Sequence, residues 1–416
     1  MNNLMAGRLA AFRVIQGVVN EGRSLGELMP HYRSMTRERE QALFYALSLG
    51  TLREYHALCQ LGQGLMSRPL AAGSRSLALL VLGLYQLLRL NLGDHGVVNE
   101  MVKMTSQLQP SHRHLMNALL RRAQRERPVL IAQLDGLAAK NLPAWLAAYP
   151  ALAAINIRQP PFTLRLNPRL QREDFIAKYA GARANPLHPQ AVSLEKSPNL
   201  ADIVEFGQGL VSVQDASGQW VATLLNPRPG ERLLDGCAAP GSKACHLLEL
   251  APDCDLLALD IDEKRLRRVA ENLERLGQKA QLKAADLRRL NDWWDGRPFD
   301  AISVDAPCSG SGVIRRHPDI PFLRTAQDLA NYPQVQREIL TAAWRTLRPG
   351  GRLLYSTCSI LPAENQQLIA AFLAAHQDCQ LEPLPLPHCE NGPHGSLHLP
   401  DGDGDGFFYA LLRKSC

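Results

Sequence analysis

Two cysteines stand where a thiol could do chemistry. Cys308 lies in the stretch DAPCSGSG and Cys358 in YSTCS, and each follows a short apolar run typical of a β-strand. A cysteine thiolate is a strong nucleophile that can also leave again, which suits covalent catalysis. A buried cysteine is more often a packing residue. From the residues alone, these could be two packing residues, one nucleophile with a bystander, or two thiols with different tasks.

Aspartates end four predicted strands in the same half of the chain. The runs ERLLDG, CDLLALD, AQLKAAD and FDAISVD end at Asp235, Asp260, Asp286 and Asp305. Helical stretches alternate with these strands, among them GSKACHLLELA and DEKRLRRVAENLERLG. This alternation predicts a doubly wound, mainly parallel sheet, in which ligands bind beyond the carboxyl ends of the strands.

The turn after the first of these strands has the composition of a cofactor loop. It reads LDGCAAPGSKACHL and contains neither GxGxxG nor GxxxxGK[ST], which weakens a dinucleotide or P-loop interpretation. Asp260 follows roughly 20 residues later, a spacing that suits a carboxylate on ribose hydroxyls. Asp286 could meet an adenine edge. The pattern predicts a pocket for S-adenosylmethionine, and the alternative is an ordinary strand-to-helix turn with solvated acids.

Four ordered motifs give the chain a family resemblance. CAAPGSK, DAPCSGSGVIRRHPD, YSTCSILPAENQ and GDGFFYALL together resemble the RNA cytosine-5 methyltransferases of the Sun (Fmu) family. HGVVNEMVKMT and HRHLMNALLRR resemble the NusB-like RNA-binding helical domain that bacterial members join to the catalytic domain. The resemblance covers nearly the whole chain. It implies methylation of carbon 5 of a cytosine in 16S (small-subunit) ribosomal RNA, at the site called cytosine 967, with S-adenosylmethionine as methyl donor.

The resemblance also assigns residues. The cofactor loop and its acidic partners are Cys237, Ala238, Ala239, Pro240, Gly241, Ser242, Lys243, Asp260, Asp286 and Asp305. The family usually has a second glycine where this chain has Ser242, so cofactor binding would be in doubt if that position needed a positive φ.

The resemblance ranks the two thiols, which bare chemistry does not. In the Sun-type enzymes the Thr-Cys cysteine, here Cys358, attacks carbon 6 of the base, and the Pro-Cys cysteine, here Cys308, assists breakdown of the adduct. DNA cytosine-5 methyltransferases use the Pro-Cys thiol as nucleophile instead. Asp305 would hydrogen-bond the N3/N4 edge of cytosine, and Lys243 would help to position the base. The cytosine must be unstacked to reach them.

The change of pattern along the chain predicts a multidomain protein. Residues 1–140 show helical periodicity and almost no strand signal, which predicts an all-α, NusB-like, RNA-binding domain. Residues 141–225 mix PPFTLRLNP, REDFIAKYA and GLVSVQDASG, which predicts a small α+β connector. Residues 226–416 carry the strand-and-helix alternation and are predicted to form an α/β, Rossmann-like methyltransferase domain.

Positive charge is concentrated in the helical part. Residues 1–140 contain 17 Lys and Arg against nine Asp and Glu, whereas the rest of the chain contains 29 against 31. Arginine forks match phosphate geometry, so the run LLRRAQRERP, with Arg121, Arg122 and Arg125, is a candidate RNA contact. A solvated helix face is the other interpretation. The arginines of RRHPD, after the Pro-Cys loop, could bind phosphates near the site or pair with nearby acids.

The composition narrows the remaining possibilities. With 46% hydrophobic and 21% charged residues the chain is typical of globular proteins. The stretch SLALLVLGLYQLLRL (76–90) is too short to span a membrane and predicts a buried helix, and the N-terminus does not have the pattern of a signal peptide. Nine scattered cysteines without a CxxC pair favour a reducing cytoplasm. DGDGDGFF resembles an EF-hand start but has Leu412 where the loop needs glutamate, so we expect no metal. We also expect the protein to be a cytoplasmic monomer.

Two other functions fit the same residues. The first is the same chemistry on transfer RNA or at another RNA site. The second is a noncatalytic RNA-binding factor with a relic methyltransferase fold, which the presence of both thiols and all four aspartates argues against.

Overall fold

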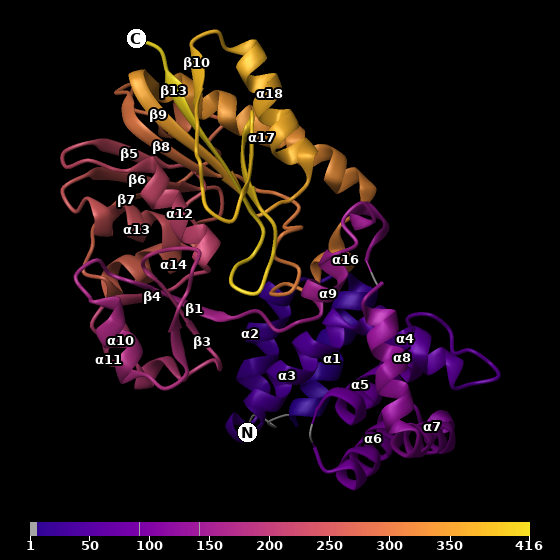
Figure 1. Ribbon diagram of the computed structural model, residues 1–416. Coiled ribbons are helices and arrows are strands. Elements are labelled where there is room, and N and C mark those ends of the chain that lie inside the picture. Colours follow the sequence, from indigo (N-terminus) through magenta and orange to yellow (C-terminus); the bar gives the residue numbers. More distant parts are fainter. Residues whose placement is uncertain (1–5, 91, 141) are drawn as a thin grey trace. The chain divides into compact units, whose positions relative to one another are not determined.

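The computed structural model describes residues 6–90, 92–140 and 142–416 (Figure 1). The described chain divides into two compact units. A helical unit holds the residues up to Gln159 together with the segment Ile314–Thr325, and a second unit holds all the others. No helix of the described residues has the length and apolar character needed to cross a membrane.

The helical unit has no strand among its described residues, in agreement with the periodicity of its sequence. Its α-helices are α1 (Gly7–Glu21), α2 (Leu25–Met35), α3 (Gln41–Arg53), α4 (Tyr55–Gly64), α5 (Arg75–Arg89), α6 (Asp94–Leu108), α7 (Arg113–Arg125), α8 (Arg127–Ala138), α9 (Leu152–Asn156) and α16 (Ile320–Leu323). Single 3-10 turns occur at Glu38–Glu40, Pro110–His112 and Ala144–Leu146.

Helix α5 is the centre of this unit. It comprises the apolar stretch identified in the sequence, and its side chains from Ser76 to Leu84 are all buried. The hydroxyl of Ser74 accepts a hydrogen bond from the amide of Leu77 and so begins the helix. Burial on every side explains why this helix is apolar all round, as predicted for a helix inside a globular core.

The segment Ile314–Thr325 belongs to the helical unit although its sequence neighbours do not. Phe322 stacks on His56, with ring centroids 4.9 Å apart, and meets Tyr55 edge-on. The carboxylate of Asp319 accepts a hydrogen bond of 2.8 Å from the amide of Leu25, the first residue of α2. The segment is therefore an integral part of the helical core.

The second unit begins with a small antiparallel sheet of order β2-β3-β1-β4. Its strands are β1 (Phe162–Leu166), β2 (Ala182–Ala184), β3 (Ala191–Leu194) and β4 (Val211–Val213). Helices α10 (Arg172–Lys178), α11 (Val204–Gly207) and α12 (Ala216–Leu225) and the 3-10 turn Leu200–Asp202 lie between or after these strands. Leu164, Val192 and Phe175 form part of a separate apolar cluster over the sheet.

The large sheet follows, and it has the alternation predicted from the sequence. Its strands are β5 (Arg232–Asp235), β6 (Asp255–Asp260), β7 (Gln281–Ala284), β8 (Phe299–Asp305), β9 (Leu347–Thr357), β10 (Cys379–Glu382), β11 (Glu390–Gly392), β12 (Gly395–His398) and β13 (Phe407–Lys414). The helices between them are α13 (Ser242–Leu250), α14 (Glu263–Arg275), α15 (Leu290–Trp293), α17 (Ala326–Thr346) and α18 (Gln366–Ala375), with a 3-10 turn at Pro362–Glu364.

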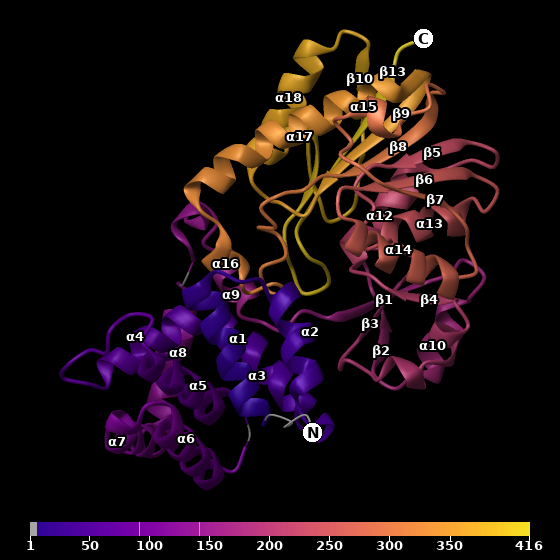
Figure 2. The same cartoon turned by 180° about the vertical axis from the view of Figure 1, so that it is seen from behind.

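The order of these strands places their carboxyl ends around a reversal point. Strands β7-β6-β5-β8-β9 run parallel. On the β9 side follow β13, β12 and β11, each antiparallel to its neighbour, and β10 also pairs with β13. Helices α12, α13 and α14 lie on one face of the sheet, and α17 and α18 lie on the other (Figures 1 and 2). The order reverses between β5 and β8, which is where ligands bind in open α/β sheets. The predicted fold class is confirmed.

Candidate active site

The predicted cofactor loop connects β5 to α13 by a tight turn. The amide of Gly241 donates to the carbonyl of Ala238 at 2.7 Å, and Gly241 has φ of 103°, which favours glycine. A Cβ at Gly241 would lie 3.0 Å from the Cα of Val269, so the close approach to α14 also requires glycine. Ser242 is the first residue of α13 and is not among the positive-φ positions. The serine therefore fits this loop without backbone strain.

Asp260 and two residues of α14 hold this loop. The Asp260 carboxylate ends β6, is buried, and accepts a hydrogen bond of 3.1 Å from the amide of Ala239. Arg265 donates to the carbonyl of Ala239 at 3.1 Å, and Asn272 donates to the carbonyl of Pro240 at 3.0 Å. Sequence reasoning singled out Asp260 but missed Arg265 and Asn272. Their signal was their place on the helix that directly follows Asp260.

Lys243 and Asp305 form an ion pair at the reversal point of the sheet. The Lys243 Nζ atom lies 2.6 Å from Asp305 Oδ2, and the hydroxyl of Ser356 donates to Asp305 Oδ1 at 3.3 Å. Burial disfavours the charged lysine, but the Asp305 carboxylate outweighs it and raises the pKa of Lys243. The same Nζ lies 5.5 Å from the ring centre of Phe407, which belongs to the GDGFFYALL motif. The structure thus brings together all four of the sequence motifs.

Asp235 is a site residue that the sequence reasoning left out. It ends β5, is completely buried, and neither of its carboxylate oxygens accepts a hydrogen bond of normal geometry. Burial raises its pKa to about 7, against the opposing charge of Lys243 and with a further increase from Asp305 and Asp260. The pattern of strands ending in aspartate contained this residue, because Asp235 ends the first of them.

The two thiols lie in contact. Cys308 Sγ is 3.4 Å from Cys358 Sγ, and both side chains are half-buried. They follow adjacent parallel strands, in which Asp305 of β8 is opposite Ser356 of β9. The hydrogen bond with Cys358, then burial, raises the pKa of Cys308 well above its usual value. The geometry favours a thiol pair over two independent packing residues.

Asp286 and Arg315 lie in surroundings that the sequence did not indicate. Strand β7 ends at Ala284, so Asp286 stands two residues beyond it, where Arg288 makes a bidentate ion pair with its carboxylate. This pairing lowers the pKa of Asp286.

Arg315, from RRHPD, is buried in the helical unit, and its carbonyl accepts a hydrogen bond from Arg53. This burial disfavours a phosphate contact by the Arg315 side chain, and pairing with nearby acids stays a prediction.

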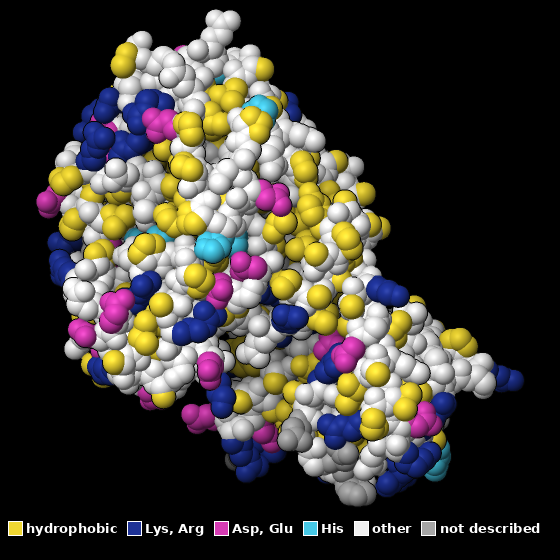
Figure 3. Space-filling model, viewed as in Figure 1, with side chains coloured by type: hydrophobic (Ala, Val, Ile, Leu, Met, Phe, Trp, Pro, Cys, Tyr) yellow, Lys and Arg dark blue, Asp and Glu magenta, His cyan; other side chains and the backbone are white. Residues whose placement is uncertain are grey.

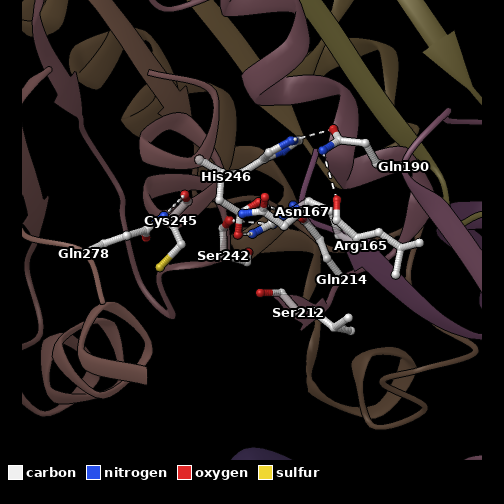
Figure 4. Close-up of polar contacts among 12 residues, drawn as sticks. Arg165, Asn167, Gln190, Ser212, Gln214, Ser242, Cys245, His246 and Gln278 are labelled. Carbon is white, nitrogen blue, oxygen red and sulfur yellow. Dashed lines mark hydrogen bonds and ion pairs between the residues drawn. The ribbon is translucent and has the colours of Figure 1, made fainter. Parts of the chain in front are cut away.

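The small sheet positions α13 through buried polar contacts (Figure 4). Arg165 of β1 makes a bidentate ion pair with Glu249 at 2.8 and 3.0 Å and donates to the carbonyl of Ser242 at 3.0 Å. Gln190 contacts the ring of His246 at 3.0 Å. Arg165 is fully buried, so these contacts fix α13 at both ends, including the first turn, which carries Lys243.

Fold and site define the class of protein. A parallel sheet with a glycine turn after β5, a carboxylate at the end of β6 and a thiol pair beyond β8 and β9 is the arrangement of a Rossmann-like methyltransferase domain, here joined to a helical unit. Residues 222–413 match the family model described as 16S rRNA methyltransferase RsmB/F, and residues 5–125 match the NusB family model.

Whole-chain relatives identify the family. The chain is 41% identical to ribosomal RNA small subunit methyltransferase B of Salmonella newport (strain SL254), with 99% of each chain covered. It is also 41% identical to the protein of the same name from Sodalis glossinidius, with 98% of this chain and 97% of that one covered. The protein belongs to the RsmB/F family of ribosomal RNA methyltransferases.

Solved structures agree on the fold. The crystal structure of PH0851 covers 97% of this chain and 98% of its own, with a TM-score of 0.77 and 23% identity. A methyltransferase homolog protein from Pyrococcus horikoshii covers 68% of this chain and 95% of its own, with a TM-score of 0.56 and 29% identity.

Proposed function

We propose that this protein transfers a methyl group from S-adenosylmethionine to carbon 5 of a cytosine in 16S ribosomal RNA, at cytosine 967, through a covalent adduct with Cys358. The observation that carries the proposal is the contact between Cys308 Sγ and Cys358 Sγ, 3.4 Å apart at the end of β8 and β9. A single nucleophile would not need a second thiol, whereas adduct formation and breakdown give the two sulfur atoms separate tasks.

The residues at the β5/β8 reversal fit a cationic cofactor. Asp260, Asp305 and Lys243 all lie near Asp235, and both oxygens of Asp235 are buried without a hydrogen bond of normal geometry. A cationic ligand would compensate this excess of acid. Asp260 would bind ribose hydroxyls, and Ile261, 67% exposed directly after it, offers an apolar surface for a purine ring. When bound, S-adenosylmethionine supplies an electrophilic methyl group on a sulfonium centre.

The chain's own residues would then act on the base. The Cys358 thiolate adds to carbon 6 of an unstacked cytosine, which makes carbon 5 nucleophilic. Asp305 hydrogen-bonds the N3/N4 edge, and Lys243, paired with Asp305 at 2.6 Å, keeps that carboxylate in place and positions the base. Cys308 assists loss of the carbon 5 proton, after which Cys358 leaves and the ring double bond is restored.

The RNA target rests on the relatives and on charge. The two whole-chain relatives are named as small-subunit ribosomal RNA methyltransferases. The helical unit carries the excess of arginine, and Lys and Arg side chains are visible over the part that carries α6 and α7 (Figures 1 and 3). We infer that this unit supplies affinity for RNA. We also propose that the protein acts in the cytoplasm as a monomer.

Bisulfite sequencing tests the proposal directly. Total RNA from cells with and without this protein should differ at one cytosine of 16S ribosomal RNA, and wild-type protein supplied from a plasmid should restore the modification. Loss of 5-methylcytosine from transfer RNA instead would assign another substrate to the same chemistry. Unchanged RNA in all fractions would favour a noncatalytic RNA-binding factor.

A further inference from the structure

Glu364 has a buried carboxylate that the chemistry above does not use. Its side chain is 1% exposed, and it lies in the turn after Cys358, within the motif YSTCSILPAENQ. Its Oε2 atom accepts hydrogen bonds from the Ser309 amide at 2.8 Å and from Gln336 Nε2 at 2.9 Å. Its Oε1 atom accepts one from the Ser359 hydroxyl at 2.6 Å. All three donors are neutral, so the contacts serve position more than charge balance.

The three donors are all linked to the two thiols. Ser309 directly follows Cys308, and Ser359 directly follows Cys358. Gln336, from α17, also donates to the carbonyl of Pro307 at 2.9 Å, so the residues on both sides of Cys308 are tied to the same pair of side chains.

The strands by themselves do not place the sulfur atoms. Strand β8 ends at Asp305 and β9 at Thr357, and the backbone pairing continues only to the bond from the Ala306 amide to the Ser356 carbonyl. Cys308 lies beyond that point, in a loop without strand pairing, and needs another anchor. Two contacts supply part of this anchor. The hydroxyls of Ser309 and Ser359 lie 3.1 Å apart, and the Gly312 amide donates a hydrogen bond to the Cys358 carbonyl.

We propose that Glu364 is the positioning residue of the thiol pair: by holding Ser309 and Ser359 with one carboxylate, it keeps Cys308 Sγ and Cys358 Sγ within reach of each other. The catalytic consequence, correct breakdown of the adduct, rests on the proposed function, whereas the distance between the sulfur atoms does not. Positioning of the thiol pair requires hydrogen-bonding groups in the right places on residue 364. It does not require the negative charge of the Glu364 carboxylate.

Two variants separate geometry from charge. In Glu364→Gln the amide oxygen can still accept from Ser309 and Gln336, and the amide nitrogen can donate to the hydroxyl oxygen of Ser359. Glu364→Ala removes this acceptor from all three groups, although Gln336 keeps another, the carbonyl of Pro307. The matched control is Glu231→Ala, which removes another largely buried carboxylate, paired with Arg352 in the same unit but not bonded to either thiol loop.

The readout is capture of phenylarsine oxide by the purified full-length protein. This arsenic(III) reagent forms two As–S bonds with two neighbouring thiols and releases one water, so tight binding requires a close pair. The variant Cys308→Ser has only one of the two thiols and gives the level of arsenical binding expected without a close pair. Glu364→Ala should weaken binding at least about tenfold, as expected when buried donors lose their partner. Glu364→Gln and Glu231→Ala should stay within about twofold, since they leave the geometry of the pair in place.

A parallel assay follows the protein–RNA adduct in the presence of S-adenosylmethionine. Glu364→Ala should accumulate adduct where Glu364→Gln turns over, because misplaced Cys308 cannot assist release. Unchanged arsenical capture in Glu364→Ala, or an equal loss in Glu231→Ala, would overturn the positioning role. If the wild type transfers no methyl group to RNA and Cys308→Ser accumulates no adduct, the proposed function fails, while the arsenical result still decides the role of Glu364.

Discussion

Cys308 and Cys358 are separated by 50 residues in the chain, and their sulfur atoms lie 3.4 Å apart. The raised pKa of Cys308 follows first from its hydrogen bond with Cys358 and then from burial. The contact brings both thiols to one reacting base, and the order of their tasks remains a prediction that the two cysteine variants test.

The first prediction is that the two cysteines fail in different ways. Cys358→Ser should abolish both methyl transfer and the covalent adduct, because a serine hydroxyl is barely ionised at neutral pH. Cys308→Ser should still attack and methylate and then stall, so a protein–RNA species stable to denaturing electrophoresis should accumulate. The double variant should form none.

Two outcomes would contradict this assignment. An adduct that survives Cys358→Ser and disappears in Cys308→Ser would make the Pro-Cys thiol the nucleophile. Equal, adduct-free partial activity in both single variants would mean that neither thiol acts covalently.

The second prediction concerns Asp260 and the cofactor. Asp260→Ala should weaken S-adenosylmethionine binding by roughly 1–3 kcal/mol, the usual loss for hydrogen bonds to a charged group. In Asp260→Asn the amide oxygen can still accept a hydrogen bond from the Ala239 amide. This variant should therefore keep the loop in place and lose less affinity for S-adenosylmethionine than Asp260→Ala. Calorimetry measures both. Unaltered affinity in a folded Asp260→Ala protein would remove this residue from the site.

The third prediction follows from the pKa of Asp235, which burial raises from 3.8 to about 7. Between these two values the folded protein holds a proton that the unfolded chain has released, so stability falls as pH rises and levels off above pH 7. Asp235→Asn lacks this titration. From pH 5 to pH 8 the unfolding free energy of the wild type should therefore drop relative to the variant by on the order of 2–3 kcal/mol.

Urea denaturation of the cofactor-free protein at both pH values measures this difference. Parallel pH dependence of the wild type and Asp235→Asn would show that the carboxyl has an ordinary pKa.

The fourth prediction separates RNA contacts from structural arginines in α7. Arg121 and Arg125 are exposed, whereas Arg122 donates to the carbonyl of Leu65 at 3.0 Å and pairs with Glu126. Reversing the charge of Arg121 and Arg125 should weaken RNA binding and lower the slope of log affinity against log salt by roughly 1–2. S-adenosylmethionine affinity should not change.

Filter binding at several salt concentrations provides the measurement. Arg122→Glu is the comparison, since it should also lower the melting temperature. If the double reversal leaves the salt slope as it was, the basic run is a solvated helix face.

The sequence by itself determined the local elements and their class. The apolar run of residues 76–90 predicted the buried helix α5, and acids followed by arginines and Gly277 predicted the start and end of α14, where Asp262 caps the helix and Gly277 has φ of 64°. Runs ending at Asp235, Asp260 and Asp305 predicted three parallel strands that end at those residues. Such features depend on residues that are close to one another in the chain, so the sequence contains all the information that specifies them.

Only the tertiary structure decided which distant residues meet. It placed Ile314–Thr325 in the helical unit, although this segment begins six residues after Cys308 in sequence. It joined Glu364 and Gln336 to the loops that carry the thiols. These contacts depend on how strands and helices far apart in the chain pack, and no local pattern of residue types specifies that packing. The sequence could therefore name the two thiols, while their contact required the fold.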